Sequence, residues 1–295
     1  MPYSSNSSKR SAPETWSASL LRRDLRNRAL HLAATERLLH DQTPGNSSSV
    51  IFGCDEQLRH GNFHPASYGA ICANPQWLRR LAKPHTAHRK LRARADWEWK
   101  ELDCANSSDA LLMNIFCHPE VAAAESISAP VARLLGIDAS AAPVFGVHPG
   151  VPLRSGLLDR TEIDLQLNTL FVEAKLTETN FQTARPRMIA RYRDLEEVFN
   201  VSRLLPRNNQ PPNAAIPGYQ LIRNVFAAYA SGSSFCVLCD GRRHDLIETW
   251  YRVLSAVDRP TFAARLKLLT WQELAIALPA GLQQFLEMKY GICLV

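Results

Sequence analysis

The segment EIDLQLNTLFVEAKL, residues 162–176, constrains the fold most strongly, because apolar and polar residues alternate in it on both sides of a short break. Alternation with a period of two is typical of β-strands. A two-residue turn at Asn168 and Thr169 pairs Leu167 with Leu170 and makes the segment a hairpin. One face of this hairpin is wholly apolar and must be buried; it carries Ile163, Leu165, Leu167, Leu170, Val172, Ala174 and Leu176.

The other face of the hairpin sets two carboxylates against each other. In the same register Asp164 lies opposite Glu173 and Glu162 lies opposite Lys175, with cross-strand partners about 5 Å apart. Like charges directly opposite destabilise a hairpin, and a divalent cation between them would remove that repulsion. Asp and Glu oxygens are ligands that Mg²⁺ takes together with waters and substrate phosphate. Lys175 points the same way and could orient a water or stabilise charge on a phosphate. The alternative is an ordinary sheet face whose alternating charges meet water.

The elements around the hairpin predict an α/β fold with a mixed central sheet flanked by helices. Before the hairpin, NSSDALLMNIFCHP is typical of a serine-capped helix that ends at a proline, and a second helix is expected over about residues 121–136. After it, we expect a long arginine-bearing helix over about residues 183–202. The helix GYQLIRNVFAAYA and the buried strand FCVLCD follow. The order helix, hairpin, helix, strand, helix is that of helices packed on a sheet.

The cysteines and the apolar residues are distributed as in a protein of the reducing cytoplasm. Seven scattered cysteines do not form a disulfide framework. Cys236 and Cys239 form a CxxC, but their odd separation on a strand places them on opposite faces, which disfavours a shared metal. The sequence has no apolar run of signal-peptide length and none that reaches the roughly 18 residues of a membrane span. We therefore expect a cytoplasmic protein with no membrane partner.

Four segments in order resemble the PD-(D/E)XK nuclease superfamily, which has a restriction-endonuclease-like fold. Asp164 followed by Glu173, Ala174 and Lys175 matches the superfamily's Asp…Glu-x-Lys signature. Within it, SSDALLMNIFCHP, EIDLQL…FVEAKLTE, YQLIRN and LTWQEL…KYGI resemble a bacterial restriction endonuclease family over about residues 60–295. The resemblance implies hydrolysis of DNA phosphodiesters with Mg²⁺, for which Mn²⁺ can substitute. It makes Asp164, Glu173 and the Ala174 backbone carbonyl metal ligands, and Lys175 the catalytic lysine. Ile163 stands where the superfamily often has a proline, which makes the signature less specific.

Several residues near this signature have two interpretations each. Glu162 is either a further metal ligand or, slightly favoured, the salt-bridge partner of Lys175. In nucleases of the superfamily a glutamate on the first helix can bind a second metal. The acid that this helix offers is Asp109, with Glu101 just before it, and each is expected instead to be a helix cap or a solvated charge.

Gln220, Arg223 and Asn224 share a face of the helix that the resemblance places over the active site, where such polar groups hold the carboxylates or a phosphate. Gln220 would support the carboxylates and Arg223 would contact a phosphate. The alternative is a helix face that meets water.

A basic stretch, RRLAKPHTAHRKLRAR, is flanked by tryptophans and has no acid. Basic residues interleaved with aromatics suit a nucleic-acid backbone, and the formal net charge of +6 favours a polyanionic partner. The alternative is a solvated charged surface. The candidate DNA contacts in this stretch and in the helix expected over residues 183–202 are Arg79, Arg80, Lys83, Arg89, Lys90, Arg92, Arg94, Arg185, Arg187 and Arg191.

Three regions are expected along the chain. Residues 1–15 form a serine-rich disordered tail, residues 16–103 a basic and mostly helical extension that contacts DNA, and residues 104–295 the nuclease core. The resemblance implies a restriction-type DNA endonuclease. A repair, recombination or mobile-element nuclease of the same fold and a DNA-binding protein that does not cleave stay open as alternatives. Cutting both strands commonly takes two active sites, which makes a homodimer one expected arrangement.

Overall fold

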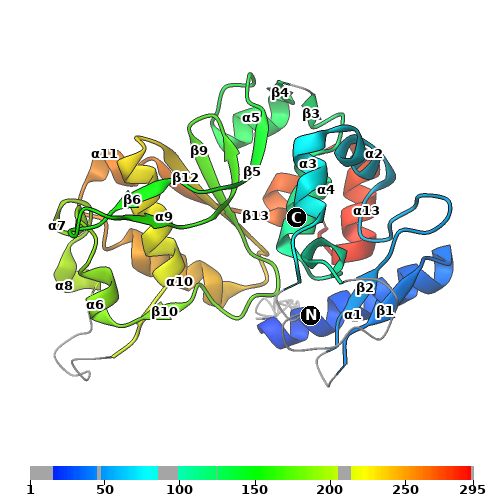
Figure 1. Cartoon of the computed structure of the whole chain (residues 1–295), viewed down its shortest axis with the longest axis horizontal. Coiled ribbons are helices and arrows are strands. Elements are labelled where there is room, and N and C mark those ends of the chain that lie inside the picture. The colour runs from blue at the N-terminus through cyan, green and yellow to red at the C-terminus, as the bar shows by residue number, and fades with distance from the viewer. Residues whose placement is uncertain (1–15, 45–47, 86–98, 124, 205–213, 294–295) are drawn as a thin grey trace, which may run out of the picture.

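A mixed five-stranded sheet runs through the middle of the computed structural model (Figure 1), which describes residues 16–44, 48–85, 99–123, 125–204 and 214–293. The strand order is β13-β12-β9-β8-β5, in which β5 and β8 are antiparallel to their neighbours and β9, β12 and β13 run parallel. The strands are β5 (Pro143–Val147), β8 (Ile163–Leu167), β9 (Leu170–Ala174), β12 (Ser234–Cys239) and β13 (Leu266–Thr270). The predicted α/β fold with a mixed central sheet is confirmed.

The β8–β9 hairpin has the predicted register. Leu167 pairs with Leu170, and Leu165 pairs with Val172. Asn168 has a φ of 50°, a left-handed conformation that asparagine tolerates well in tight turns. All seven residues assigned to the apolar face are fully buried. Ile163 alone among them packs in the cluster on the opposite face of the sheet, at the end of β8 where the two strands part.

Helices cover both faces of the sheet, as Figure 1 shows. Cys236 packs in one hydrophobic cluster and Cys239 in the other, so the predicted opposite orientation of the two thiols is confirmed. The first face is covered by α1 (Ala18–Glu36), α4 (Ser108–Phe116), α5 (Ala129–Leu135), α12 (Trp271–Ala275) and α13 (Ala280–Tyr290). The second is covered by α9 (Tyr219–Ala230), α10 (His244–Leu254), α11 (Pro260–Ala263) and three short helices, α6 (Pro186–Ile189), α7 (Leu195–Val198) and α8 (Val201–Leu204).

Smaller elements surround this sandwich. Trp77 on α3 donates from its indole nitrogen to the carbonyl oxygen of Pro143 at 3.2 Å, which ties the N-terminal region to edge strand β5. The smaller elements are β1 (His40–Gln42), β2 (Val50–Phe52), α2 (Pro65–Ala73), α3 (Pro75–Leu81), the 3₁₀ turn η1 (Glu101–Asp103), β3 (Ala122–Ala123), β4 (Ser126–Ile127), β6 (Gly150–Pro152), β7 (Leu158–Arg160), β10 (Thr183–Ala184) and β11 (Ile216–Pro217).

The long helix expected over residues 183–202 is wrong. The structure has β10 and the short helices α6, α7 and α8 in its place. The backbone groups of Arg191 and Arg193 bond to Arg154 and Pro152, beside β6, and not to helical partners. Tyr192 lies between them as a fully buried core residue. Packing of this aromatic side chain and the bonds to β6 therefore override the helical pattern.

The helix expected over residues 121–136 is wrong in its first half, where β3 and β4 form a hairpin. The helix α5 begins only at Ala129, with Pro130 in its first turn. Proline has no N–H to donate and clashes with the preceding turn, so a helix can begin just before Pro130 but cannot run through it.

Two expectations fall on residues outside the described ranges: the disordered tail over residues 1–15, and the part of the basic stretch within residues 86–98. Within the described ranges, no helix has the length and apolar character needed to cross a bilayer.

Candidate active site

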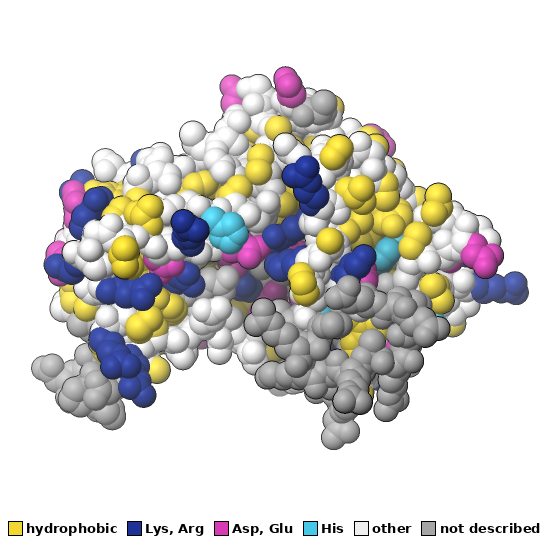
Figure 2. Space-filling view, viewed as in Figure 1, with side chains coloured by type: hydrophobic (Ala, Val, Ile, Leu, Met, Phe, Trp, Pro, Cys, Tyr) yellow, Lys and Arg dark blue, Asp and Glu magenta, His cyan; other side chains and the backbone are white. Residues whose placement is uncertain are grey.

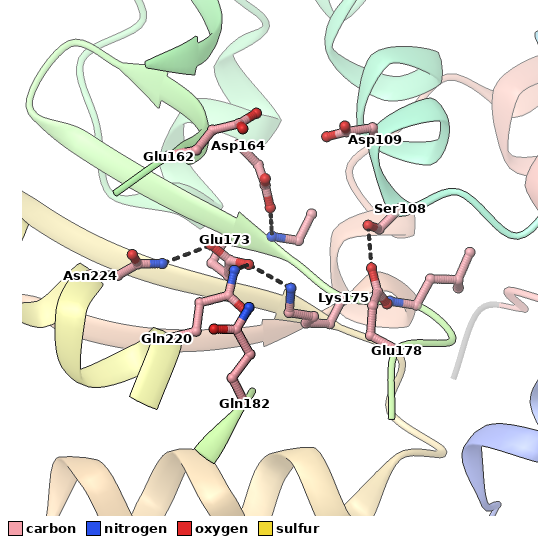
Figure 3. Close-up of polar contacts among 12 residues, drawn as sticks. Ser108, Asp109, Glu162, Asp164, Glu173, Lys175, Glu178, Gln182, Gln220 and Asn224 are labelled. Carbon is pink, nitrogen blue, oxygen red and sulfur yellow. Dashed lines mark hydrogen bonds and ion pairs between the residues drawn. The ribbon is translucent and has the colours of Figure 1, made fainter. Parts of the chain in front are cut away.

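The hairpin brings Asp164, Glu173 and Lys175 together where β8 and β9 separate (Figure 3). The N–H of Ala174 donates to Asp164 Oδ2 at 2.8 Å, so the aspartate side chain lies against the end of β9. Lys175 Nζ lies 2.6 Å from Glu173 Oε1. The predicted juxtaposition of the two acids and the lysine is therefore present.

Helix α9 fixes the carboxylate of Glu173, which is fully buried. Gln220 Nε2 donates to Glu173 Oε1 at 2.6 Å, and Asn224 Nδ2 donates to Oε2 at 2.7 Å. Thr161 in turn donates its hydroxyl to Asn224 Oδ1 at 3.2 Å. A buried carboxylate needs such partners, because an unpaired charge in the interior is costly. Gln220 holds a carboxylate, as expected, and Asn224, one residue beyond Arg223, does the same.

The acids of the site raise one another's pKa. Burial raises the pKa of Asp164 well above its ordinary value, and the charges of Glu173 and Asp109 raise it further. Burial also raises the pKa of Glu173. Burial opposes the charge on Lys175, but the carboxylates of Glu173, Glu178 and Asp164 outweigh it and raise the lysine pKa. Lys175 is therefore a cation at neutral pH, among carboxylates that repel each other.

Two further acids, Glu162 and Asp109, reach the site, and each has other partners than the sequence suggested (Figure 3). Glu162 Oε1 pairs with Arg80 at 2.7 Å, and Lys175 turns to Glu173, so the favoured Glu162–Lys175 salt bridge is wrong. Asp109 is 6% exposed and binds Arg80 at 3.0 Å and Lys83 at 2.6 Å. It is neither a solvated charge nor the helix cap.

The cap of α4 is instead Ser107, whose side chain accepts from the N–H of Ala110. This leaves the side chain of Asp109, two residues later, free to point toward the sheet. Burial of Asp109 works against its charge, but Arg80 and Lys83 hold the pKa of that carboxyl below its ordinary value.

Arg80 reaches Glu162 and Asp109 by crossing over Gly146 of β5. Gly146 has a φ of +64°, and a Cβ there would lie 2.2 Å from Arg80 Nη1. Only glycine meets both conditions at this position. The N-terminal region thus contributes two cations to the rim of the site, Arg80 on α3 and Lys83 just after it.

Glu178, three residues after Lys175, also lies at the site, beside the start of α4 (Figure 3). Glu178 accepts from Ser108 Oγ at 2.6 Å and from the N–H of Leu176 at 2.6 Å. Neither the place of Glu178 nor that of Asp109 was predicted from the sequence, since nothing in the spacing of α4 indicates that it packs against this end of the hairpin.

The predicted DNA contacts lie in different settings. Arg80 and Lys83 are ion-paired in the site, and Arg223 and Arg191 both bind Asp159, at 2.8 and 2.9 Å. On the face seen in Figure 2, Lys and Arg side chains lie close to acidic side chains in the middle of the molecule. Of the others, Arg79, Arg185 and Arg187 are exposed, and Arg89, Lys90, Arg92 and Arg94 lie outside the described residues.

The donor atoms at the hairpin end are of the type that suits Mg²⁺. The described residues contain no group of three or more His, Cys, Asp or Glu arranged to hold a metal ion. Mg²⁺, however, needs only one or two protein carboxylates together with waters and substrate. Asp164 Oδ1 accepts no hydrogen bond from the described residues, and burial together with the nearby charges of Glu173 and Asp109 raises the pKa of Asp164, which a bound cation would offset. The residues at this position therefore fit a hard divalent cation.

A family model described as Restriction Endonuclease associating with ARP matches residues 27–291. No curated protein and no solved structure matches the chain. The family match spans nearly the whole chain, including both strands of the hairpin, α9, Arg80 and Lys83. The chain therefore belongs to the REase-ARP family, Restriction Endonuclease associating with ARP.

Proposed function

We propose that this protein is a Mg²⁺-dependent DNA endonuclease of restriction type. The observation that carries the proposal is the meeting of Asp164, Glu173 and Lys175 at the end of the hairpin, with a 2.6 Å contact between Lys175 and Glu173. The family description, which names a restriction endonuclease, supports a nuclease with DNA as its substrate.

Asp164 and Glu173 would hold the metal, with the backbone carbonyl of Ala174 beside them. Because the N–H and C=O of one strand residue point toward the same neighbouring strand, the Ala174 carbonyl is directed toward β8, like its N–H. When bound, Mg²⁺ polarises a phosphoryl oxygen and lowers the pKa of a water. Gln220 and Asn224 keep Glu173 in one orientation, so that the ligand geometry is set before substrate arrives.

Lys175 would stabilise negative charge on the phosphate as it develops. Its raised pKa keeps it protonated at neutral pH, which suits a hydrogen-bond donor and not a general base. Both its backbone and its side chain are held in place. The backbone carbonyl of Lys175 accepts from the indole N–H of Trp271 at 2.9 Å, and its ammonium pairs with Glu173. Lys175 therefore reaches the reacting phosphate from a rigid strand end.

A plasmid-nicking assay with and without EDTA tests this function. We expect wild-type protein to convert supercoiled DNA to nicked or linear forms with Mg²⁺ or Mn²⁺ and to be inactive with EDTA. Lys175→Met should lower the cleavage rate about 10²–10⁴-fold, the usual effect of losing one electrostatic catalyst. DNA binding measured without metal should change little in this variant. Equal cleavage with EDTA present, or full activity of Lys175→Met, would refute the proposal.

A further inference from the structure

Two arginines beside the active site share one buried carboxylate. Asp159 on β7 is 8% exposed. Its Oδ1 accepts from Arg223 Nη2 at 2.8 Å, and its Oδ2 accepts from Arg191 Nη2 at 2.9 Å and from the Tyr192 hydroxyl at 2.6 Å. No other acid among the described residues forms an ion pair with either arginine. The cluster therefore carries one positive charge more than it neutralises.

Both guanidinium groups are held in place, but each still has N–H groups that donate to no residue in the described part of the chain. Arg191 lies over the Tyr192 ring at 5.7 Å and Arg223 over the Tyr219 ring at 5.5 Å, and the two tyrosine hydroxyls lie 3.2 Å apart. The Nε atoms of both arginines are buried without a partner. The Nη1 atoms make no hydrogen bond to the described residues either. The two side chains are 39% and 22% exposed, so a ligand can reach them.

The segments that hold this arginine pair are joined by hydrogen bonds to the carboxylate of Glu173. Arg223 directly precedes Asn224 on α9, which donates to Glu173 at 2.7 Å. Thr161, two residues after Asp159, donates to the same Asn224. Asp159 and Arg223 therefore lie within two residues of Thr161 and Asn224, the hydrogen-bonded pair that holds Glu173, so the same segments position the arginine pair and that carboxylate.

We infer that Arg191 and Arg223 form a second phosphate site, which binds a phosphodiester beside the one that is cleaved. Two arginines with free donors on planar groups suit phosphate oxygens better than lysines do. The excess of one positive charge matches the single negative charge of a phosphodiester. Asp159 and the two tyrosines act here as positioning residues, because they orient the guanidinium groups without touching DNA. This inference rests on the proposed function for the identity of the ligand.

The salt dependence of DNA binding, measured with EDTA on a short duplex, tests the site without requiring cleavage. Each phosphate contact on duplex DNA contributes about 0.9 to the slope of log K against log salt. We expect Arg191→Gln and Arg223→Gln each to lower the slope by about that amount, whereas Arg223→Lys, which keeps the charge, should largely retain it. Arg193→Gln is the matched control, since Arg193 is two residues from Arg191 and is ion-paired with Asp194 at 2.7 Å.

Thermal unfolding of the same variants separates binding from structure. If Arg191→Gln and Arg223→Gln lower the melting temperature but leave the salt slope at the wild-type value, the cluster only fastens β7 to α9 and the inference is wrong. Equal loss of slope in Arg193→Gln would also overturn it, because the effect would then belong to general surface charge.

Substrates with one neutral methylphosphonate beside the cleaved bond test where the site lies. Wild-type cleavage should fall about tenfold or more on such a substrate, whereas Arg223→Gln should show no further loss, as expected for two changes that remove one contact. A further loss in Arg223→Gln equal to that of wild type would contradict the inference. If wild-type protein cleaves no DNA, the proposed function fails, while the salt slope still decides whether the arginine pair binds phosphate.

Discussion

At the scale of single residues, the charge on Asp164 dominates the site. Its pKa is raised by burial and by Glu173 and Asp109. An acid whose pKa is higher in the folded than in the unfolded chain binds more protons when folded. The free energy of unfolding therefore falls as the pH rises from the ordinary aspartate pKa toward the raised one. Above that interval the metal-free protein carries the full destabilisation.

We expect Asp164→Asn to stabilise the metal-free protein at pH 7–8, because it removes this repulsion and keeps an oxygen for the Ala174 N–H. The gain should grow by about 1.4 kcal/mol for each pH unit above the ordinary aspartate pKa, until the pH passes the raised pKa, and it should vanish toward pH 4. Urea unfolding in EDTA across this pH range measures it. Glu36→Gln, at an exposed acid at the end of α1, serves as the control and should have no such effect. A loss of stability in Asp164→Asn at neutral pH would show that the acids do not repel one another.

At the scale of elements, α3 is fastened to the β8–β9 hairpin by Arg80. Its guanidinium binds Asp109 on α4 and Glu162 before β8, and it is only 14% exposed. Removing one partner of a buried ion pair leaves the other charge uncompensated. The contact therefore joins the N-terminal region to the core more strongly than a surface salt bridge would.

Arg80→Met should lower the free energy of unfolding by about 3–5 kcal/mol, as expected when a buried charge network loses its central cation. Arg79→Met is the matched control: Arg79 is the neighbouring residue on α3 but is exposed, and its loss should change stability by less than about 0.5 kcal/mol. Chemical unfolding curves of the two variants give the comparison. Equal and small effects in both would mean that the network around Asp109 does not couple α3 to the core.

The elements themselves were predictable to different degrees. The hairpin register, seen in the pairs Leu167–Leu170 and Leu165–Val172, follows from local alternation and from a turn at Asn168, so the sequence was sufficient. The contacts of Asp109 with Arg80 depend on how α3 and α4 pack on the sheet, and no local pattern encodes that. The helix expected over residues 183–202 was wrong for the same reason: the backbone around Tyr192 bonds to residues beside β6, far away in sequence.

At the scale of the whole molecule, the N-terminal region is part of the main core. Leu21 and Leu25 of α1 are buried in the same cluster as Leu286 of α13 and the apolar face of the hairpin. In Figure 1, α1 lies along the lower edge of the half of the molecule that holds α4 and α13. Removing α1 would therefore expose apolar side chains of the core, such as Leu286, which is fully buried in the complete chain.

A chain that begins at residue 104 should therefore not fold cooperatively, although the sequence suggests a boundary there. It would expose the α1-facing side of the core and leave Asp109 and Glu162 without Arg80 and Lys83. We expect a broad urea transition and binding of a hydrophobic dye, in contrast to a sharp transition for the whole chain. A sharp transition at the same midpoint would show that residues 104–295 form an independent domain.

The central claim is that Asp164 and Glu173 are opposed in order to hold one divalent cation, and calorimetry of Mg²⁺ binding tests it most directly. Titrations of wild type and of Asp164→Asn, with and without a DNA duplex, should be run in buffers of different ionisation enthalpy. We predict that wild type binds Mg²⁺ and releases protons, because the cation lowers the raised pKa of the acids. In Asp164→Asn the affinity should fall at least tenfold and the proton release should shrink. Equal affinity in the two proteins, or no Mg²⁺ binding by wild type even with DNA present, would contradict the account.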